Sequence, residues 1–357
     1  MRENKIFCSV VIPTINRPVL SRAVHSVLNQ DFHAAEFEVI VVNDTGHPLP
    51  EKAWQHSRHV QVITIQRRER SVARNTGAAI ARGKYLYFLD DDDIMLPNAL
   101  RALWELAEQT NARWLYGGYQ VVDDEGQILE EFHPNLIGNI SAFLIAGEAI
   151  PLQASLVSTD AFYAAGEFDV YFTGAQDRDL GRRISLRCHV AETSALITQI
   201  RVGQTKSSTA WAKLPEFDRL GREKALDQSN ALACLYDSAR DNKYLFGRVC
   251  RAYLASAAWN VKRRCIFKTA SRLVSSATFG IPYILSPDFW KGLRTKIQPL
   301  GEIRRIKDPS WNSLCSIAVI ITLLSILMSI TLVIKRSTWT QRVILSHAYH
   351  PTSDLHR

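Results

Sequence analysis

The sequence predicts an α/β domain with a doubly wound, mostly parallel sheet and helices on both faces, followed by a helical region and one transmembrane helix. Two observations lead to this prediction. Short apolar runs alternate with segments of helical spacing in the first part of the chain, and 21 consecutive residues near its end carry no charge. The composition, 46% hydrophobic and 22% charged over 357 residues, is typical of a folded chain of about two domains.

Five apolar runs predict the strands. Each is rich in Val, Ile or Tyr and too short for a core helix, which is typical of strands buried on both faces of a parallel sheet. They occupy residues 8–14, 38–44, 60–65, 85–90 and 112–118. Helical spacing appears between them at residues 18–29, 71–82 and 97–110. Pro18 and Pro97 suit a first helical turn, and Ser71 is a candidate helix cap.

Polar side chains end three of the predicted strands, namely Pro13 and Thr14, Asn43 and Asp44, and Asp90 to Asp93. Because ligands of such sheets collect at the carboxyl ends of the strands, we expect these residues to converge on one site. Asp44 could accept a hydrogen bond from a base or a ribose, or form an Asx-turn. Arg74 could pair with a phosphate or a base, or form a surface salt bridge.

The run FLDDDDIMLP at residues 88–97 predicts a metal site. Four adjacent carboxylates repel one another, which costs free energy unless a cation or hydrogen-bond donors compensate. Carboxylate oxygens favour a hard divalent ion such as Mg²⁺ or Mn²⁺, with substrate phosphates completing its shell. The alternative is a solvated acidic turn that caps the next helix, a role that Asp93 could fill.

Charge and missing motifs exclude several other functions. No G-x-G-x-x-G follows the first apolar run and no G-x-x-x-x-G-K-[ST] occurs, so dinucleotide redox and P-loop chemistry are not expected. The net charge is +8, and residues 257–357 hold fifteen Lys and Arg against four Asp and Glu. The basic charge therefore lies in the last part of the chain, which favours a membrane surface over a nucleic acid as partner.

Several motifs, taken in order, resemble the family 2 glycosyltransferases with the GT-A fold. They are SVVIPTINRP (9–18), VIVVNDTG (39–46), RSVARNTGAAIARGKYLYFLDDDD (70–93) with Pro97, and AAGEFDVYFTGAQDRDLGRRI (164–184). The resemblance extends over residues 7–210. It implies an inverting enzyme that moves a sugar from a nucleotide-diphosphate donor, UDP-linked, to a hydroxyl of a glycan or lipid-linked acceptor in cell-envelope polysaccharide synthesis.

The resemblance also implies roles for individual residues. The donor-binding set is Pro13, Thr14, Asp44, Arg74, Asp90 and Asp92, and the ligands of Mg²⁺ or Mn²⁺ are Asp92 and Asp93. In the family a Glu-Asp pair before a helix supplies the catalytic base. Here the pair is Gln176 and Asp177, a departure that leaves Asp177 as the implied base.

Two further points concern these positions. Asp177 and Asp179 could instead be first-turn helix carboxylates that the helix dipole favours. Gly203 stands where many family members place a metal-binding histidine, so a third metal ligand of that kind is not expected.

Residues 314–334 carry no charge, and a helix of that length reaches about 31 Å, close to the roughly 30 Å of a bilayer core. Trp311 and Trp339 suit interfacial anchoring. This predicts one transmembrane helix at 311–336, with a buried core helix as the alternative. Five basic residues before the span against three after it favour a cytosolic catalytic domain at the inner (cytoplasmic) membrane.

The predicted segments are a catalytic domain (1–210), a basic helical region (211–310), the transmembrane helix and a short tail (337–357). In the helical region, residues 220–240 and 246–274 have helical periodicity. The second of these is a basic amphipathic stretch, which suits either a membrane surface or a helical cap. Two other functions stay open, a catalytically silent nucleotide- or glycan-binding scaffold and an Asp-based phosphotransfer enzyme.

Overall fold

The computed structural model describes residues 6–33, 37–66, 69–202 and 213–295. The predicted transmembrane helix and tail, Gly203 and the predicted boundary at residue 210 lie outside the described residues. Within the described ranges, the helices fall short of the length and apolarity that crossing a membrane requires.

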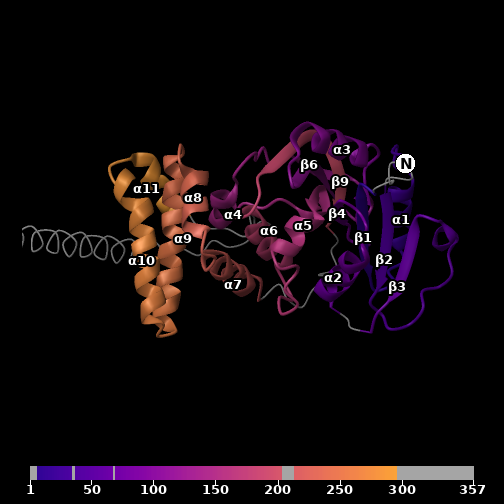
Figure 1. Cartoon of the computed structure of the whole chain (residues 1–357), viewed down its shortest axis with the longest axis horizontal. Helices are drawn as coiled ribbons and strands as arrows, with labels where there is room; N and C mark the ends of the chain where they lie inside the picture. The colour runs from indigo at the N-terminus through magenta and orange to yellow at the C-terminus, as the bar shows by residue number, and fades with distance from the viewer. Residues whose placement is uncertain (1–5, 34–36, 67–68, 203–212, 296–357) are drawn as a thin grey trace, which may run out of the picture. The chain divides into compact units, whose positions relative to one another are not determined.

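A nine-stranded sheet is the centre of the fold (Figure 1), with the order β3-β2-β1-β4-β8-β6-β9-β5 and β7 paired to β6. Its strands are β1 (Cys8–Thr14), β2 (Phe37–Asn43), β3 (Val60–Thr64), β4 (Tyr85–Phe88), β5 (Ile94–Met95), β6 (Trp114–Val122), β7 (Ile128–Phe132), β8 (Ser155–Ser158) and β9 (Val190–Arg201). The pairings give β1, β2, β3, β4, β6 and β9 one direction, and β5, β7 and β8 the opposite one. The mostly parallel sheet is therefore confirmed.

All five predicted strands are present, but β5, β7, β8 and β9 were not predicted. The run at 112–118 became β6, which does not adjoin β4, because β8 lies between them and pairs antiparallel with both. β5 has two residues and β8 has four. These are too few residues to show a recognisable strand pattern in the sequence. β7 is almost wholly exposed, so it lacks the apolar pattern on which the prediction rested.

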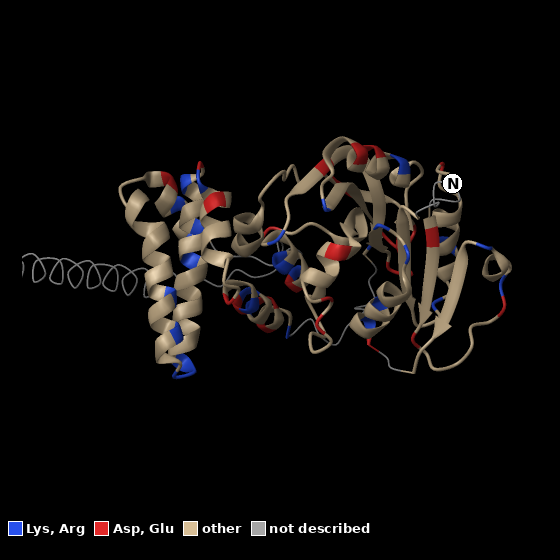
Figure 2. Cartoon of the chain, viewed as in Figure 1, with Lys and Arg blue, Asp and Glu red and all other residues tan. Residues whose placement is uncertain are grey.

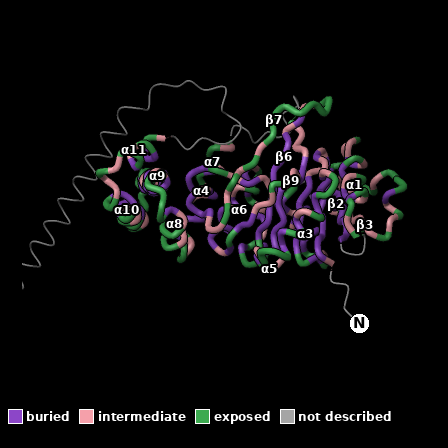
Figure 3. The backbone as a smooth tube through the Cα atoms, turned by 90° about the horizontal axis from the view of Figure 1, so that it is seen from above, coloured by how far each residue is buried: buried purple, intermediate pink, exposed green. Residues whose placement is uncertain are grey.

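Helices cover both faces of the sheet. On one face lie α1 (Leu20–Leu28) and α3 (Ala99–Thr110), and on the other α2 (Arg70–Ile80), α5 (Thr159–Ala164) and α6 (Gln176–Ser185). Side chains of β1 alternate between the two cores, with Val10 and Ile12 in the first and Val11 in the second. Every residue of β1 and β2 is buried, and the central strands are purple in Figure 3.

The cap of α2 differs from the prediction. The Glu69 carboxylate accepts hydrogen bonds from the N–H groups of Ser71 (3.0 Å) and Val72 (2.8 Å), and Ser71 itself lies buried within the first turn. Ser71 was favoured because hydroxyls are common caps. A carboxylate two residues earlier reaches the same free N–H groups.

Beyond β9 the described chain is helical. Its elements are α7 (Leu214–Leu226), α8 (Ala231–Ala239), α9 (Lys243–Lys262), α10 (Ile266–Gly280), the short η5 (Ile281–Tyr283) and α11 (Pro287–Arg294). The helical periodicity of 246–274 corresponds to two helices, because the chain turns between α9 and α10, where Arg264 has a φ of 59°. The hairpin is closed by Phe279, whose ring lies 5.4 Å from Phe246 and 5.7 Å from Tyr253.

The helical region joins the sheet domain through α4 (Ser141–Ala146) and the residues before it. The Asn139 side-chain amide donates to the Cys234 carbonyl at 3.0 Å, and the Ser238 hydroxyl donates to the Asn139 carbonyl at 2.6 Å. Three further bonds to α8 start from Ser141, Ala142 and Asn139. The helices after β9 are thus bonded to the sheet domain.

α9 and α11 cross at two glycines. A Cβ on Gly292 would overlap the Tyr244 carbonyl oxygen, and one on Gly247 would overlap the Phe289 carbonyl oxygen. Phe289 is itself fully buried. The two helix backbones are therefore in direct contact at this crossing.

Gly292→Ala is expected to lower the free energy of unfolding by about 1–3 kcal/mol, because the added methyl group must push the two backbones apart. Gly280→Ala on α10 is the matched control, since a Cβ there has its nearest neighbour at 3.5 Å. Helix propensity alone would favour that alanine by up to about 1 kcal/mol. Urea unfolding of both variants checks the prediction, which equal stabilities would contradict.

Candidate active site

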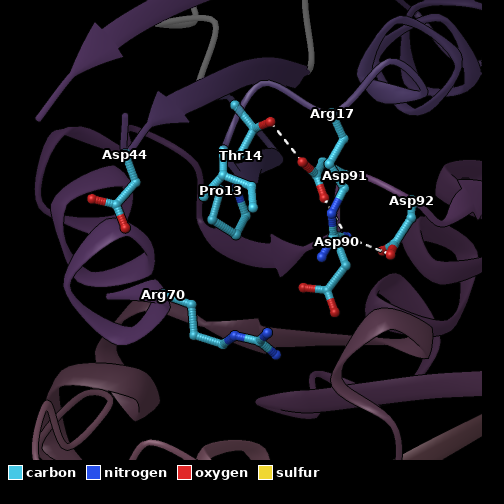
Figure 4. Close-up of a pocket in the computed structure, with 9 residues that line it drawn as sticks. Pro13, Thr14, Arg17, Asp44, Arg70, Asp90, Asp91 and Asp92 are labelled. Carbon is cyan, nitrogen blue, oxygen red and sulfur yellow. Dashed lines mark hydrogen bonds and ion pairs between the residues drawn. The ribbon is translucent and has the colours of Figure 1, made fainter. Parts of the chain in front are cut away.

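A pocket of about 320 Å³ opens at the carboxyl ends of β1, β2 and β4 (Figure 4). It is lined by Pro13, Thr14, Ile15, Arg17, Asp44, Arg70, Asp90, Asp91 and Asp92. Strand β1 pairs with β2 on one side and β4 on the other, so strand order reverses there, and ligands bind at such switch points. The predicted convergence of three strand ends is present, and the volume suits a small molecule.

The acidic run is not a solvated turn. Asp91 and Asp93 are almost fully buried. The Thr14 hydroxyl donates to Asp91 at 2.6 Å, and the Arg17 guanidinium donates to the other oxygen of Asp91 at 2.9 Å while it also pairs with Asp92. Thr14 at the end of β1 and Arg17 just beyond it therefore hold two of the four carboxylates in place.

Arg74 is not among the residues that line the pocket. It is 4% exposed, and its Nη2 lies 2.6 Å from Asp90 Oδ1. Its guanidinium stands 5.2 Å from the centre of the Phe168 ring, and the Gln153 amide donates to the second oxygen of Asp90 at 2.9 Å. Arg74 thus forms a buried ion pair that orients Asp90, and Arg70, one turn earlier on α2, lines the pocket instead.

Asp44 lies across the pocket from the acidic run, on the other side of Pro13 (Figure 4). It is buried, and its backbone N–H donates to the Thr14 carbonyl at 2.8 Å. An Asx-turn is formed by its neighbour Asn43, whose side-chain oxygen accepts from the N–H (3.2 Å) and hydroxyl (2.9 Å) of Thr45. The strand end thus carries an Asx-turn at Asn43, directly before Asp44.

Three carboxylates could hold a divalent cation. Ligand oxygens of Asp90, Asp92 and Asp93 all lie within 4.8 Å of one another. Asp93 accepts the Arg201 N–H at 2.8 Å, and in the described part of the chain no basic side chain forms an ion pair with it. An oxygen-only set with one uncompensated buried carboxylate fits Mg²⁺ or Mn²⁺.

The carboxyl groups of this set have different pKa values. Burial raises the pKa of Asp93 well above its usual value, and the nearby charges of Asp90 and Asp92 raise it further. Burial likewise raises the pKa of Asp92. Burial acts on Asp90 in the same direction, but Arg74 and Arg70 outweigh it, so the pKa of Asp90 is below its usual value.

Mn²⁺ binding is expected to weaken as the pH falls, beginning at pH values above the usual aspartate pKa of about 4. Protons and the cation compete for the same oxygens, and raised pKa values at Asp92 and Asp93 let protons compete at higher pH. Calorimetric titration with MnCl₂ at pH values between about 8 and 5 checks this. An affinity that stays constant across that range would contradict it.

Asp177 and Asp179 both lie in the first turn of α6, but in different surroundings. Asp179 is fully buried, and the Arg183 guanidinium donates to it at 2.5 and 3.1 Å. Asp177 is exposed, its neighbour Gln176 is buried, and neither lines the pocket at the strand ends. The role of a structural carboxylate in the first helical turn therefore fits Asp179. The carboxylate of Asp177 is accessible.

A buried charge cluster holds α6 in place. Asp218 of α7 accepts hydrogen bonds from Arg182 (2.6 Å), Arg222 (2.8 Å) and Arg178 (3.3 Å). Burial alone would raise the pKa of Asp218, but the three guanidinium groups outweigh it and hold that pKa well below its usual value. The helix that carries Asp177 is therefore tied to α7.

Three polar residues outside the acidic run belong to the site and were not predicted, and the apolar Ile15 was not predicted either. Arg17 and Arg70 line the pocket, and Gln153 bonds to Asp90. The first two fall inside the motifs quoted above, so the motif match was a signal for them. Gln153 precedes β8, in a stretch without a readable motif.

The segment that forms this pocket matches a known family. Residues 9–145 match the family described as "Glycosyl transferase family 2". This family 2 segment contains every residue that lines the pocket, whereas Gln153 and Asp177 lie beyond it.

Two curated relatives are similar to the chain. Over 119 residues it is 29% identical to the poly(ribitol-phosphate) beta-N-acetylglucosaminyltransferase TarP of Staphylococcus aureus, covering 32% of this chain and 36% of that protein. Over 131 residues it is 31% identical to the GalNAc(5)-diNAcBac-PP-undecaprenol beta-1,3-glucosyltransferase of Campylobacter jejuni, covering 35% and 41%. The chain thus spans less than half the length of either relative.

A solved structure shares the fold. The crystal structure of S. aureus TarS 1-349 in complex with UDP-GlcNAc superposes with a TM-score of 0.54 at 14% identity, covering 76% of this chain and 92% of that one. With the family 2 segment, this likeness confirms a GT-A-like α/β fold.

Proposed function

We propose that this protein is a glycosyltransferase that moves a sugar from a UDP-linked donor to a hydroxyl of a glycan or lipid-linked acceptor in cell-envelope synthesis. The observation that carries this proposal is the pocket in which Asp44 faces the clustered carboxylates within the family 2 segment. The names of the two relatives, with a ribitol-phosphate polymer and an undecaprenol-linked glycan, support the acceptor class. The UDP-GlcNAc complex of TarS supports the donor class.

The donor would lie between Asp44 and the acidic run, over Pro13. The Asp44 carboxylate suits a base edge or a ribose hydroxyl, and the Arg70 guanidinium suits the diphosphate. Asp92 and Asp93, with Asp90 beside them, would hold Mg²⁺ or Mn²⁺. When bound, the ion supplies positive charge against the leaving diphosphate.

Asp177 is the proposed base. A carboxylate that is ionised at neutral pH can accept the proton of the acceptor hydroxyl as the new bond forms. Asp179 is unsuited to this role because it is fully buried and Arg183 donates two hydrogen bonds to one of its oxygens. One accessible carboxylate on the acceptor side favours in-line displacement, with inversion at the anomeric carbon.

We also propose that residues 314–334 anchor the protein in the cytoplasmic membrane with the catalytic domain in the cytosol. The support is the run of 21 uncharged residues and the excess of basic residues before it. Protease digestion of inside-out vesicles should then degrade the catalytic domain. Protection of that domain would contradict this orientation.

A thermal-shift panel tests the donor assignment, because a ligand that binds the folded state stabilises it by mass action. The full chain is heated with UDP-, GDP- and dTDP-linked sugars, each with and without Mn²⁺. We expect stabilisation by UDP-sugars that depends on Mn²⁺. Stabilisation by none of the nucleotide sugars would overturn the proposal.

A second assay separates the proposed enzyme from the other two functions left open by the sequence. Metal-dependent release of free UDP without an acceptor is expected of a transferase, whereas a silent scaffold would bind the donor and release none. Hydrolysis of generic phosphate esters would instead indicate phosphotransfer chemistry.

A further inference from the structure

Exposed large apolar side chains gather on the α9–α10 hairpin and the turn after it. Of the sixteen such residues in the described part of the chain, six lie between 261 and 285, namely Val261, Ile266, Phe267, Val274, Ile281 and Leu285. Phe267 and Leu285 are each 94% exposed. Scattered exposed apolar residues are normal, but a group of this density marks an interaction surface.

Three of these residues share one face of a helix. Phe267 and Val274 of α10 and Ile281, the first residue of η5, are spaced by seven residues, which is close to two helical turns. Ala270 and Thr278 lie between them on the same face and are also exposed. We call these five residues the α10 stripe.

The outer face of α10 carries Phe267 and Val274, whereas the outer face of a helix in water is mostly charged or polar. Its inner face holds the apolar Phe279 together with one buried arginine. Arg272 points inward, 5% exposed, and donates to the Leu226 carbonyl (2.8 Å) and the Ser256 hydroxyl (3.0 Å). Val274, two residues later, is 69% exposed. The outer face of α10 therefore suits an apolar environment.

A basic cluster adjoins the apolar tip of the hairpin. Lys262, Arg263 and Arg264 are exposed, and only Cys265 separates them from Ile266 and Phe267. Residues 257–295 contain seven Lys and Arg and one Asp, and Figure 2 shows basic residues at the end of the α9–α10 pair. Apolar side chains flanked by Lys and Arg are typical of helices that lie in the interface of anionic bilayers.

We propose that the α10 stripe and the basic cluster dock on the surface of an anionic lipid bilayer, with Phe267 and Val274 entering the headgroup–acyl boundary. A second copy of the chain fits less well, because two surfaces with the same excess of basic charge repel each other. Residues 314–334 of the same chain carry no charge, so they offer nothing to the basic cluster. This docking does not depend on the proposed transferase activity.

The test uses the full chain reconstituted in vesicles, with an NBD fluorophore on Cys265, which is exposed beside Ile266. Cys234 and Cys315 are replaced by serine to direct the label. We expect doxyl-labelled lipids to quench this fluorophore at least twofold in vesicles rich in phosphatidylglycerol, and much less in pure phosphatidylcholine. The control label is placed on Leu129→Cys in β7, an apolar position that is 58% exposed. In this control protein Cys265 is also replaced by serine. The control label should not be quenched.

Substitutions separate insertion from charge attraction. Phe267→Asp with Val274→Asp should reduce the quenching at Cys265 to the level of the β7 control, whereas Ile137→Asp, at a position that is 71% exposed, should leave it unchanged. Arg263→Glu with Arg264→Glu should abolish the advantage of phosphatidylglycerol. All five positions are exposed, and circular dichroism verifies that the variants are folded.

Two results would overturn the docking. In the first, quenching at Cys265 in phosphatidylglycerol equals that of the β7 label. In the second, the fluorophore is shielded from water but not reached by doxyl lipids, which would indicate a second copy or another chain segment on the stripe. Neither result bears on the donor-binding panel described above.

Discussion

Asp177→Asn is expected to lower the kcat for sugar transfer at least about a hundredfold, because the amide cannot accept the proton of the acceptor hydroxyl. Asp177 is exposed on α6 and does not line the donor pocket, so the affinity for UDP-sugar should be nearly unchanged. Steady-state rates of UDP release with acceptor give the first quantity, and calorimetric titration with the UDP-sugar gives the second.

The matched control for this substitution is Asp160→Asn, which removes another exposed first-turn carboxylate, on α5. It should leave both the rate and the donor affinity unchanged. Retention of most of the activity by Asp177→Asn would show that another group removes the proton. Asp179 is unsuitable for the comparison, because its substitution would break the buried pair with Arg183.

Asp92→Asn is expected to weaken Mn²⁺ binding on the order of a hundredfold, and transfer with it, because one of three clustered anionic oxygen donors loses its charge. Asp92 is part of the carboxylate set and is more exposed to the pocket than Asp93. Mn²⁺ titration by calorimetry or by electron paramagnetic resonance measures the loss directly, without relying on activity.

Asp91→Asn provides the contrast within the same run. Both Asp91 oxygens are occupied, one by Thr14 and one by Arg17, so this substitution should lower stability by about 1–3 kcal/mol. The Mn²⁺ affinity should change only a few-fold. If the two asparagine variants lost Mn²⁺ equally, the division of roles between Asp91 and Asp92 would be wrong.

The sequence could predict those parts of the fold that depend on local pattern. β1 and β2 are buried along their whole length, so their apolar runs are continuous and easily recognised. The break between α9 and α10 was missed because Lys262, Arg263 and Arg264 are acceptable helix residues. The chain turns at Arg264, which has the left-handed conformation, and the turned chain lets Phe279 pack against α9. That contact joins residues distant in sequence, so no local pattern indicates it.

In the site, too, local patterns could be predicted and contacts between distant residues could not. The acidic run was recognisable because four adjacent carboxylates repel one another wherever the chain places them. Arg70 and Arg74 lie one turn apart on the same face of α2. Which of them lines the pocket therefore depends on where α2 begins relative to the strand ends, and this places Arg74 against Asp90 and Phe168. Gln153 reaches Asp90 across 63 residues of sequence, and no local pattern could have indicated that bond.

The contact between α9 and α11 bears on where the chain can be shortened for crystallisation. Phe289 and Leu293 of α11 are buried, α11 packs against α9, and the backbone of Gly292 lies close to the Tyr244 carbonyl. A truncated protein that stops before Pro287 would expose the surface of α9 that α11 covers, and we expect it to aggregate during purification. One that stops after Thr295 keeps this surface covered while omitting the 314–334 run, and is the better choice for growing crystals.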